Sequence, residues 1–336
     1  FGASADSVPG AGDGTISYAR EFMTIILLGN TLTHLFFGLN NVMRASGNPN
    51  KAMQNTLLTV LLNIILAPVF IYVFGLGIAG AALATITAQT VSLVLLLYHF
   101  LNGKTVLVLE KEKLTLKPQI IKSIFSIGIA PFMLNSLACV VTVLMNNSFK
   151  TYGGDSAIGA YGIVNRVLTI GAMIVLGFNQ GMQPIAGYNY GARKMDRVAN
   201  VFKTTCLMAT IVMVVLFTTC QLFPESITSI FIEEKSGEEL LQMASNGLRI
   251  GVLAMPIVGF QMVTSNFFQS VGKAKISLFM SCTRQLLILV PMILTLPRFF
   301  GIDGVWFAMP ASDFLASMVA LIILKTQYKK VLQTKR

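Results

Sequence analysis

The chain has 336 residues, of which 54% are hydrophobic and only 12% are charged, and its mean hydropathy is +0.71. A soluble domain carries about 25% charged residues, so this chain lacks the polar side chains that would cover a soluble fold of its size. The composition excludes soluble globular, disordered and collagen-like classes. It leaves a membrane protein with many spans.

Nine stretches of the chain contain the roughly 20 mostly apolar residues that a helix needs to cross a bilayer. Blocks of about ten residues with alternating hydrophobicity, which are typical of membrane barrels, are absent. The sequence therefore predicts an all-α polytopic membrane protein. The expected spans are 18–42, 52–73, 77–101, 120–148, 157–185, 200–224, 240–268, 275–297 and 302–326.

The net charge of +11 is distributed as a topology signal. Eighteen of the 25 Lys and Arg residues fall in loops on one side of the predicted membrane, and four fall on the other. By the positive-inside rule, the basic side is cytoplasmic, so the N-terminus of this chain is expected outside and the C-terminus inside. The excess charge also attracts anionic lipid, and it requires no nucleic-acid partner.

The residues that carry most enzyme chemistry are scarce. The four cysteines lie singly in apolar runs, and the chain has two histidines. Neither a metal-ligand pattern nor the spacing of a catalytic motif is present. We therefore expect no enzymatic activity, no catalytic residue, no metal site and no cofactor.

An internal repeat relates two groups of three predicted helices. The segment 41–47 matches 266–272, and the glycines Gly77 and Gly80 match Gly301 and Gly304. Three spans precede the second copy and none precedes the first. We therefore expect the chain to be a fragment that lacks about 105 residues and three helices of a twelve-span parent with two six-helix lobes. The predicted organisation is 1–103 as the remnant of the N-terminal lobe, 104–118 as a cytoplasmic linker and 119–336 as the C-terminal lobe.

Four segments of the chain resemble the multidrug and toxic compound extrusion (MATE) family of transporters. They are 44–48 (RASGN), 153–163 (GGDSAIGAYGI), 181–192 (GMQPIAGYNYGA) and 303–313, which begins DGVW and ends PASD. The resemblance covers nearly the whole chain. It implies a V-shaped, twelve-helix exporter in the bacterial inner membrane, surrounded by membrane lipids and acting as a monomer. It also implies export of small organic cations and other amphiphiles in exchange for H+ or Na+.

One position departs from the family pattern. Many members carry an acid four residues after an asparagine in the fifth family helix, followed by proline. Here the pattern begins at Asn63 and reads Ala67-Pro68, so alanine takes the place of the acid. An ion site in the N-terminal lobe is therefore not predicted.

Polar side chains within the spans are the candidates for function. A charge at mid-bilayer costs roughly 2.5–3.5 kcal/mol or more, and Asp313 lies near the middle of the last span. Arg284 is its expected partner, and the pair has two open interpretations, ion or proton coupling and a structural contact. Four amides within spans are the substrate-cavity candidates: Asn135, Asn165, Gln261 and Gln285.

The leading functional hypothesis is a cation-coupled antiporter that exports drugs and toxic amphiphiles by alternating access. The alternative is a flippase of the same superfamily that moves a lipid-linked saccharide. A flippase would need a strongly cationic cavity to bind pyrophosphate, to which only Arg166 and Arg284 could contribute. The sequence leaves the substrate and the coupling ion open.

Overall fold

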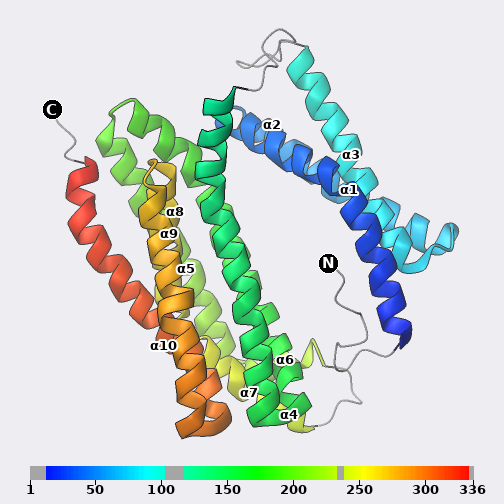
Figure 1. The fold of residues 1–336 in the computed structure, drawn as a ribbon, viewed down its shortest axis with the longest axis vertical. Helices are drawn as coiled ribbons and strands as arrows, with labels where there is room; N and C mark the ends of the chain where they lie inside the picture. Colours follow the sequence, from blue (N-terminus) through cyan, green and yellow to red (C-terminus); the bar gives the residue numbers. More distant parts are fainter. Residues whose placement is uncertain (1–12, 103–116, 233–237, 333–336) are drawn as a thin grey trace. The chain divides into compact units, whose positions relative to one another are not determined.

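The computed structural model describes residues 13–102, 117–232 and 238–332 (Figure 1). The chain forms two compact units, residues 1–115 and 116–336. Most of the predicted linker 104–118 lies outside the described residues. Each unit is therefore described by itself.

The N-terminal unit is a bundle of three long helices. Asparagine, threonine, serine and glutamine side chains join them through neutral hydrogen bonds, which replace the hydrophobic driving force that is lacking in a bilayer. Thr33 bonds to Gln89 at 2.6 Å, and Thr59 bonds to Ser92 at 2.7 Å. The helices are α1 (Asp13–Ala45), α2 (Pro49–Pro68) with its π-helical end η2 (Val69–Val73), and α3 (Gly77–Leu101).

The C-terminal unit packs the remaining helices around one core. Phe149 lies at the centre of an aromatic group, with its ring 4.8 Å from Tyr161 and 4.5 Å from Trp306. The elements are α4 (Pro118–Gly191), α5 (Met195–Leu222), α6 (Pro224–Ser229), α7 (Glu238–Gly251), α8 (Met255–Ser270), α9 (Ala274–Cys282), the π-helical η4 (Thr283–Leu289) and α10 (Val290–Leu332).

Two of these elements are helical hairpins. α4 breaks at Gly154 (φ 71°) and α10 breaks at Gly301 (φ 59°), a backbone conformation that an L side chain rarely adopts. Both elements double back at these breaks (Figure 1). Six helices, or seven with the bent pair α7–α8, are long and apolar enough to span a membrane. Dividing the two hairpins brings the described residues to the nine spans that the sequence predicted.

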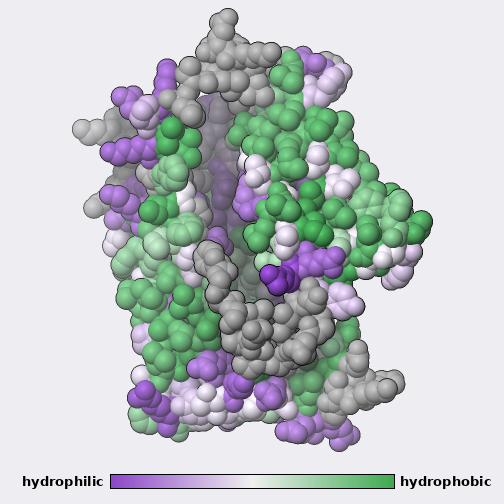
Figure 2. All heavy atoms as spheres, turned by 45° about the vertical axis from the view of Figure 1, so that its right-hand side comes forward, coloured by the Kyte–Doolittle hydropathy of each residue, from purple (hydrophilic) through white to green (hydrophobic). Residues whose placement is uncertain are grey.

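The outer surface of the helices is apolar. Leu28 on α1, Val143 on α4 and Ile211 on α5 each expose more than half of their surface. Figure 2 shows broad areas of hydrophobic side chains on the face that it draws. Soluble monomers rarely expose contiguous apolar patches larger than a few hundred Å². This surface suits a multi-pass membrane protein, as the composition predicts.

The internal repeat is present in the backbone. Gly47 and Gly272 both have positive φ, at 88° and 78°, in the turns that follow α1 and α8. Each turn also closes with a hydrogen bond to the carbonyl five residues earlier, from Asn48 to Met43 in one copy and from Lys273 to Phe268 in the other. The two three-helix groups therefore share their turn geometry as well as their sequence pattern.

Candidate functional site

An ion pair lies inside the apolar C-terminal unit. Nε of Arg284 on η4 donates to Oδ1 of Asp313 on α10 at 2.5 Å. The Asp313 side chain is 13% exposed and that of Arg284 is 33% exposed. Both charges are costly in an apolar medium, and each lowers the cost of the other. The contact expected from the sequence is present.

A wide helical turn carries the arginine. The π-helical segment η4 runs from Thr283 to Leu289, between the regular helices α9 and α10. Segments of π-helix are rare and occur frequently at functional sites. Here η4 places three polar residues in succession, Thr283, Arg284 and Gln285. The equivalent part of the first repeat copy, around Thr59, is regular α-helix.

Four residues on α4, α8 and η4 bury side-chain atoms that have no hydrogen-bond partner. We call them, together with Arg284 and Asp313, the polar layer. Unpaired buried polar atoms cost about 1–3 kcal/mol each, so most native ones are satisfied. The unpaired atoms are both side-chain polar atoms of Asn179, Oε1 of Gln261, Oγ1 of Thr283 and Oε1 of Gln285.

The helix register brings Asn179, Gln261 and Gln285 to about one level. The hydroxyls of Ser265 and Ser281 lie 3.2 Å apart where α8 passes α9 in the opposite direction. One helical turn further along each chain segment, Gln261 and Gln285 reach the same height. Likewise Gln183 on α4 donates to Asn266 on α8 at 3.1 Å, which places Asn179, four residues earlier, beside the level of Gln261.

The layer contains some of the predicted site residues and omits others. Gln261 is 4% exposed and Gln285 is half-buried, and both belong to it. The other two cavity candidates, Asn135 and Asn165, have exposed side chains on α4. Arg166, named as a possible cavity cation, is also exposed.

Two residues of the layer were not singled out from the sequence. Asn179 is 1% exposed, and Thr283 is 7% exposed. The spacing of four residues between Asn179 and Gln183 indicates a shared helix face and was the available signal for Asn179. Thr283 had no comparable signal, because threonine inside an apolar helix usually bonds to its own backbone.

The layer offers two kinds of chemistry to a ligand. The free amide and hydroxyl atoms can hydrogen-bond the polar groups of an organic molecule without a charge being desolvated. The Arg284–Asp313 pair adds a carboxylate and a guanidinium, which are bonded to each other in this structure.

We expect the substitution Gln261→Met to stabilise the protein. Methionine keeps the length of the side chain and removes a buried oxygen that has no partner, so the free energy of unfolding should rise by about 1 kcal/mol. Thermal unfolding in detergent would measure the change. If the amide serves a ligand, the same variant will bind that ligand more weakly. A lower unfolding temperature would instead mean that Gln261 is satisfied in the folded protein.

Comparisons with known proteins agree on the kind of molecule. The MatE family model matches residues 127–294. Multidrug export protein MepA of Staphylococcus aureus is 25% identical over 318 residues, which are 95% of this chain and 69% of that protein. Multidrug export protein MepA of Staphylococcus saprophyticus is 25% identical over 319 residues, which are 94% of this chain and 68% of that protein.

Solved structures have the same fold. An outward-facing multidrug resistance MATE family transporter of the MOP superfamily superposes with a TM-score of 0.90 and 22% identity over 98% of this chain and 74% of its own. A MOP superfamily transporter from Pyrococcus furiosus, described as having a binding pocket of reverse polarity, gives a TM-score of 0.87 and 22% identity. The second match covers 97% of this chain and 73% of that one.

Proposed function

Because the chain belongs to the MatE family, whose model matches half of its length, we propose that it takes part in the export of drugs and other organic amphiphiles. The MepA relatives are named as multidrug export proteins, and they align with at least 94% of this chain. The expected energy source is the inward movement of H+ or Na+ through an antiport cycle. The expected place is the bacterial inner membrane, with the N-terminus of this chain outside and its C-terminus in the cytoplasm.

The Arg284–Asp313 pair is the observation that supports coupling. In one state, Arg284 neutralises Asp313 at 2.5 Å, as the structure has it. In the other, a proton or Na+ on the carboxylate takes the place of the arginine, and the guanidinium is released toward the polar layer. The carboxylate is neutralised in both states. In the second state the Arg284 guanidinium keeps its charge, and the unpaired oxygens of the polar layer, together with the solvent that reaches a third of its side chain, would stabilise it.

The lipid-linked saccharide flippase is less well supported. A pyrophosphate would need several free cations in a central cavity. Of the two arginines that the sequence offered, Arg284 is bound to Asp313 and Arg166 is exposed on α4. The amides of the polar layer are neutral and fit an uncharged or cationic organic group better than a diphosphate.

Ethidium retention in efflux-deficient bacteria tests the proposal. Cells that express the protein should retain several-fold less ethidium than cells with the empty vector. Collapsing the proton gradient, or removing sodium, should abolish the difference, and the treatment that does so identifies the coupling ion. If protein present in the membrane leaves retention unchanged, drug export is wrong and saccharide-lipid transport becomes the next activity to measure.

A further inference from the structure

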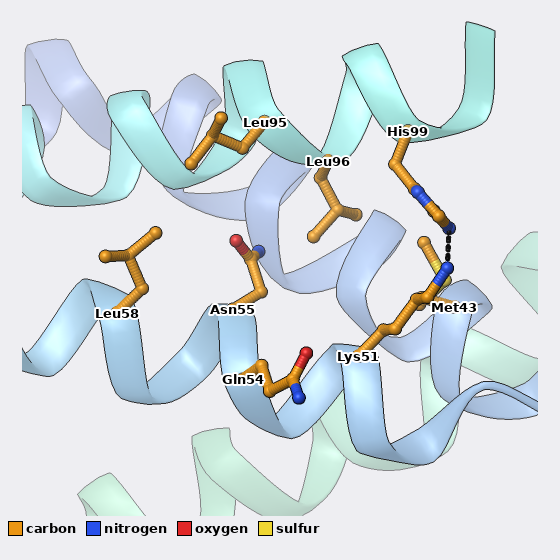
Figure 3. A pocket seen from close by; sticks show the side chains of 8 residues that line it. All are labelled: Met43, Lys51, Gln54, Asn55, Leu58, Leu95, Leu96 and His99. Carbon is orange, nitrogen blue, oxygen red and sulfur yellow. Dashed lines mark hydrogen bonds between the residues drawn. The ribbon is translucent and has the colours of Figure 1, made fainter. Parts of the chain in front are cut away.

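A pocket of about 330 Å³ opens between the three helices of the N-terminal unit (Figure 3). It is lined from α1, α2 and α3, and it is distant in sequence from the polar layer. None of the described residues that line it is acidic. The lining residues are Met43, Lys51, Gln54, Asn55, Leu58, Leu95, Leu96 and His99.

One end of the pocket is rich in hydrogen-bond donors. Nζ of Lys51 lies 3.2 Å from Nε2 of His99, so the ammonium group uses one of its three hydrogens there. Nδ2 of Asn55, one turn along α2, is buried without a partner. Gln54 adds a second amide. A cationic group beside a buried, unused donor is suited to an anion, and above all to the several acceptor oxygens of a phosphate.

The other end of the pocket is apolar. Figure 3 shows Lys51 and His99 at one end and Leu58 and Leu95 at the other, with Asn55 between them. Leu58 follows Lys51 by seven residues on α2, or about 10 Å along the helix axis. Lys51 stands two residues after the start of α2, so the leucine end lies deeper in the spanning segment. The predicted orientation places the lysine end at the cytoplasmic surface of the membrane.

We propose that this pocket binds the headgroup of an anionic membrane phospholipid. The phosphodiester accepts hydrogen bonds from Lys51 and Asn55, and an acyl chain lies along Leu58, Leu95 and Leu96 toward the bilayer interior. Polar and apolar ends in this order match an amphiphile that stands at the interface, whereas a free phosphate would use only the donor end. The cationic lysine disfavours the organic cations expected as export substrates.

Lipid binding to the purified, detergent-solubilised protein tests this site. Native mass spectrometry should show one phosphatidylglycerol retained at lipid concentrations where phosphatidylcholine is lost. Lys51→Gln should weaken phosphatidylglycerol binding about tenfold, because it removes the charge-assisted bond. Lys203→Gln is the matched control, since Lys203 is an exposed lysine on the same predicted side in α5, and it should leave affinity unchanged.

Two further measurements identify the ligand and guard against misfolding. Asn55→Leu keeps the contact between Lys51 and His99, and it should also weaken phosphatidylglycerol while the helical circular dichroism stays native. Leu58→Asn should weaken the lipid but not glycerol phosphate. If inorganic phosphate displaces the lipid completely, the ligand of this pocket is a free anion and the lipid proposal is wrong. If Lys51→Gln and Asn55→Leu both bind phosphatidylglycerol as tightly as the wild type, the proposed site is wrong.

Discussion

The Asp313→Asn variant should lose at least nine-tenths of gradient-driven export while remaining folded in the membrane. Asparagine keeps the shape of the side chain and its hydrogen-bonding oxygen but cannot carry the negative charge that attracts a proton or Na+. Ethidium retention under an imposed gradient measures the loss. Asp303→Asn is the control, because Asp303 is an exposed acid on the same element, α10, next to the hairpin at Gly301.

The same substitution should also destabilise the protein, since it leaves the Arg284 guanidinium without its counter-ion. Removing one partner of a fully buried pair costs about 3–5 kcal/mol, and a third of the Arg284 side chain is exposed, so we expect about 1–3 kcal/mol. The double variant Arg284→Gln with Asp313→Asn removes both charges. Its unfolding temperature should return close to that of the wild type.

The double variant separates coupling from structure. If the carboxylate binds the coupling ion, the double variant regains stability and still fails to export. If the pair only holds η4 against α10, restored stability brings restored export, and the coupling proposal is then wrong. Wild-type export by Asp313→Asn alone would lead to the same conclusion without the double variant.

The membrane spans, and the hairpin that joins the last two of them, could be predicted from the sequence because they depend on local patterns. Apolar length alone marked the nine spans, and glycine in a short apolar break marked the hairpin at Gly301. The contact between Arg284 and Asp313 followed from counting residues on either side of that hairpin. A buried charge within a span has few acceptable partners, so the count was sufficient.

The polar layer could not be read in the same way, because it depends on which face of each helix is buried. Asn135 and Asn179 are both amides in long apolar stretches, yet one side chain is exposed and the other is 1% exposed. A helix that is apolar on all sides gives no period from which to choose. The π-helix of η4 was also unforeseen, since one extra residue per turn leaves no mark in the composition.

The two repeat copies differ at the positions of the ion pair. At the positions of Arg284 and Asp313, the first copy has Thr59 and Gln89. Those residues bond to Ser92 and Thr33, in a regular helix and without charge. The second copy instead has an ion pair. Both copies contain a π-helical segment, but η2 of the first copy begins ten residues after Thr59. Only in the second copy does the π-helical segment carry a member of the charged pair.

Replacing Gly304 with alanine should destabilise the C-terminal unit. Among the glycines of this unit whose φ is negative, we expect this exchange to have the largest effect. An added Cβ would lie 2.5 Å from the carbonyl oxygen of Leu296 and 2.8 Å from the nitrogen of Pro297. Both are backbone atoms, so no rotamer change can relieve the overlap. We expect a loss of about 1–3 kcal/mol or more. Thermal unfolding followed by the fluorescence of Trp306, the single tryptophan, measures it.

Gly162→Ala supplies the opposite expectation, because a Cβ there would meet nothing within 4 Å. Alanine favours a helix over glycine by about 1 kcal/mol, so this variant should unfold at the same or a higher temperature.

Gly80→Ala, at the repeat-related position, would bring a Cβ within 2.7 Å of the Phe70 carbonyl oxygen and should behave like Gly304→Ala. If Gly304→Ala unfolds no lower than Gly162→Ala, the close backbone approach at the hairpin is absent. Equal losses at Gly80 and Gly304 would mean that both repeat copies depend on the same contact between the two arms of their hairpins.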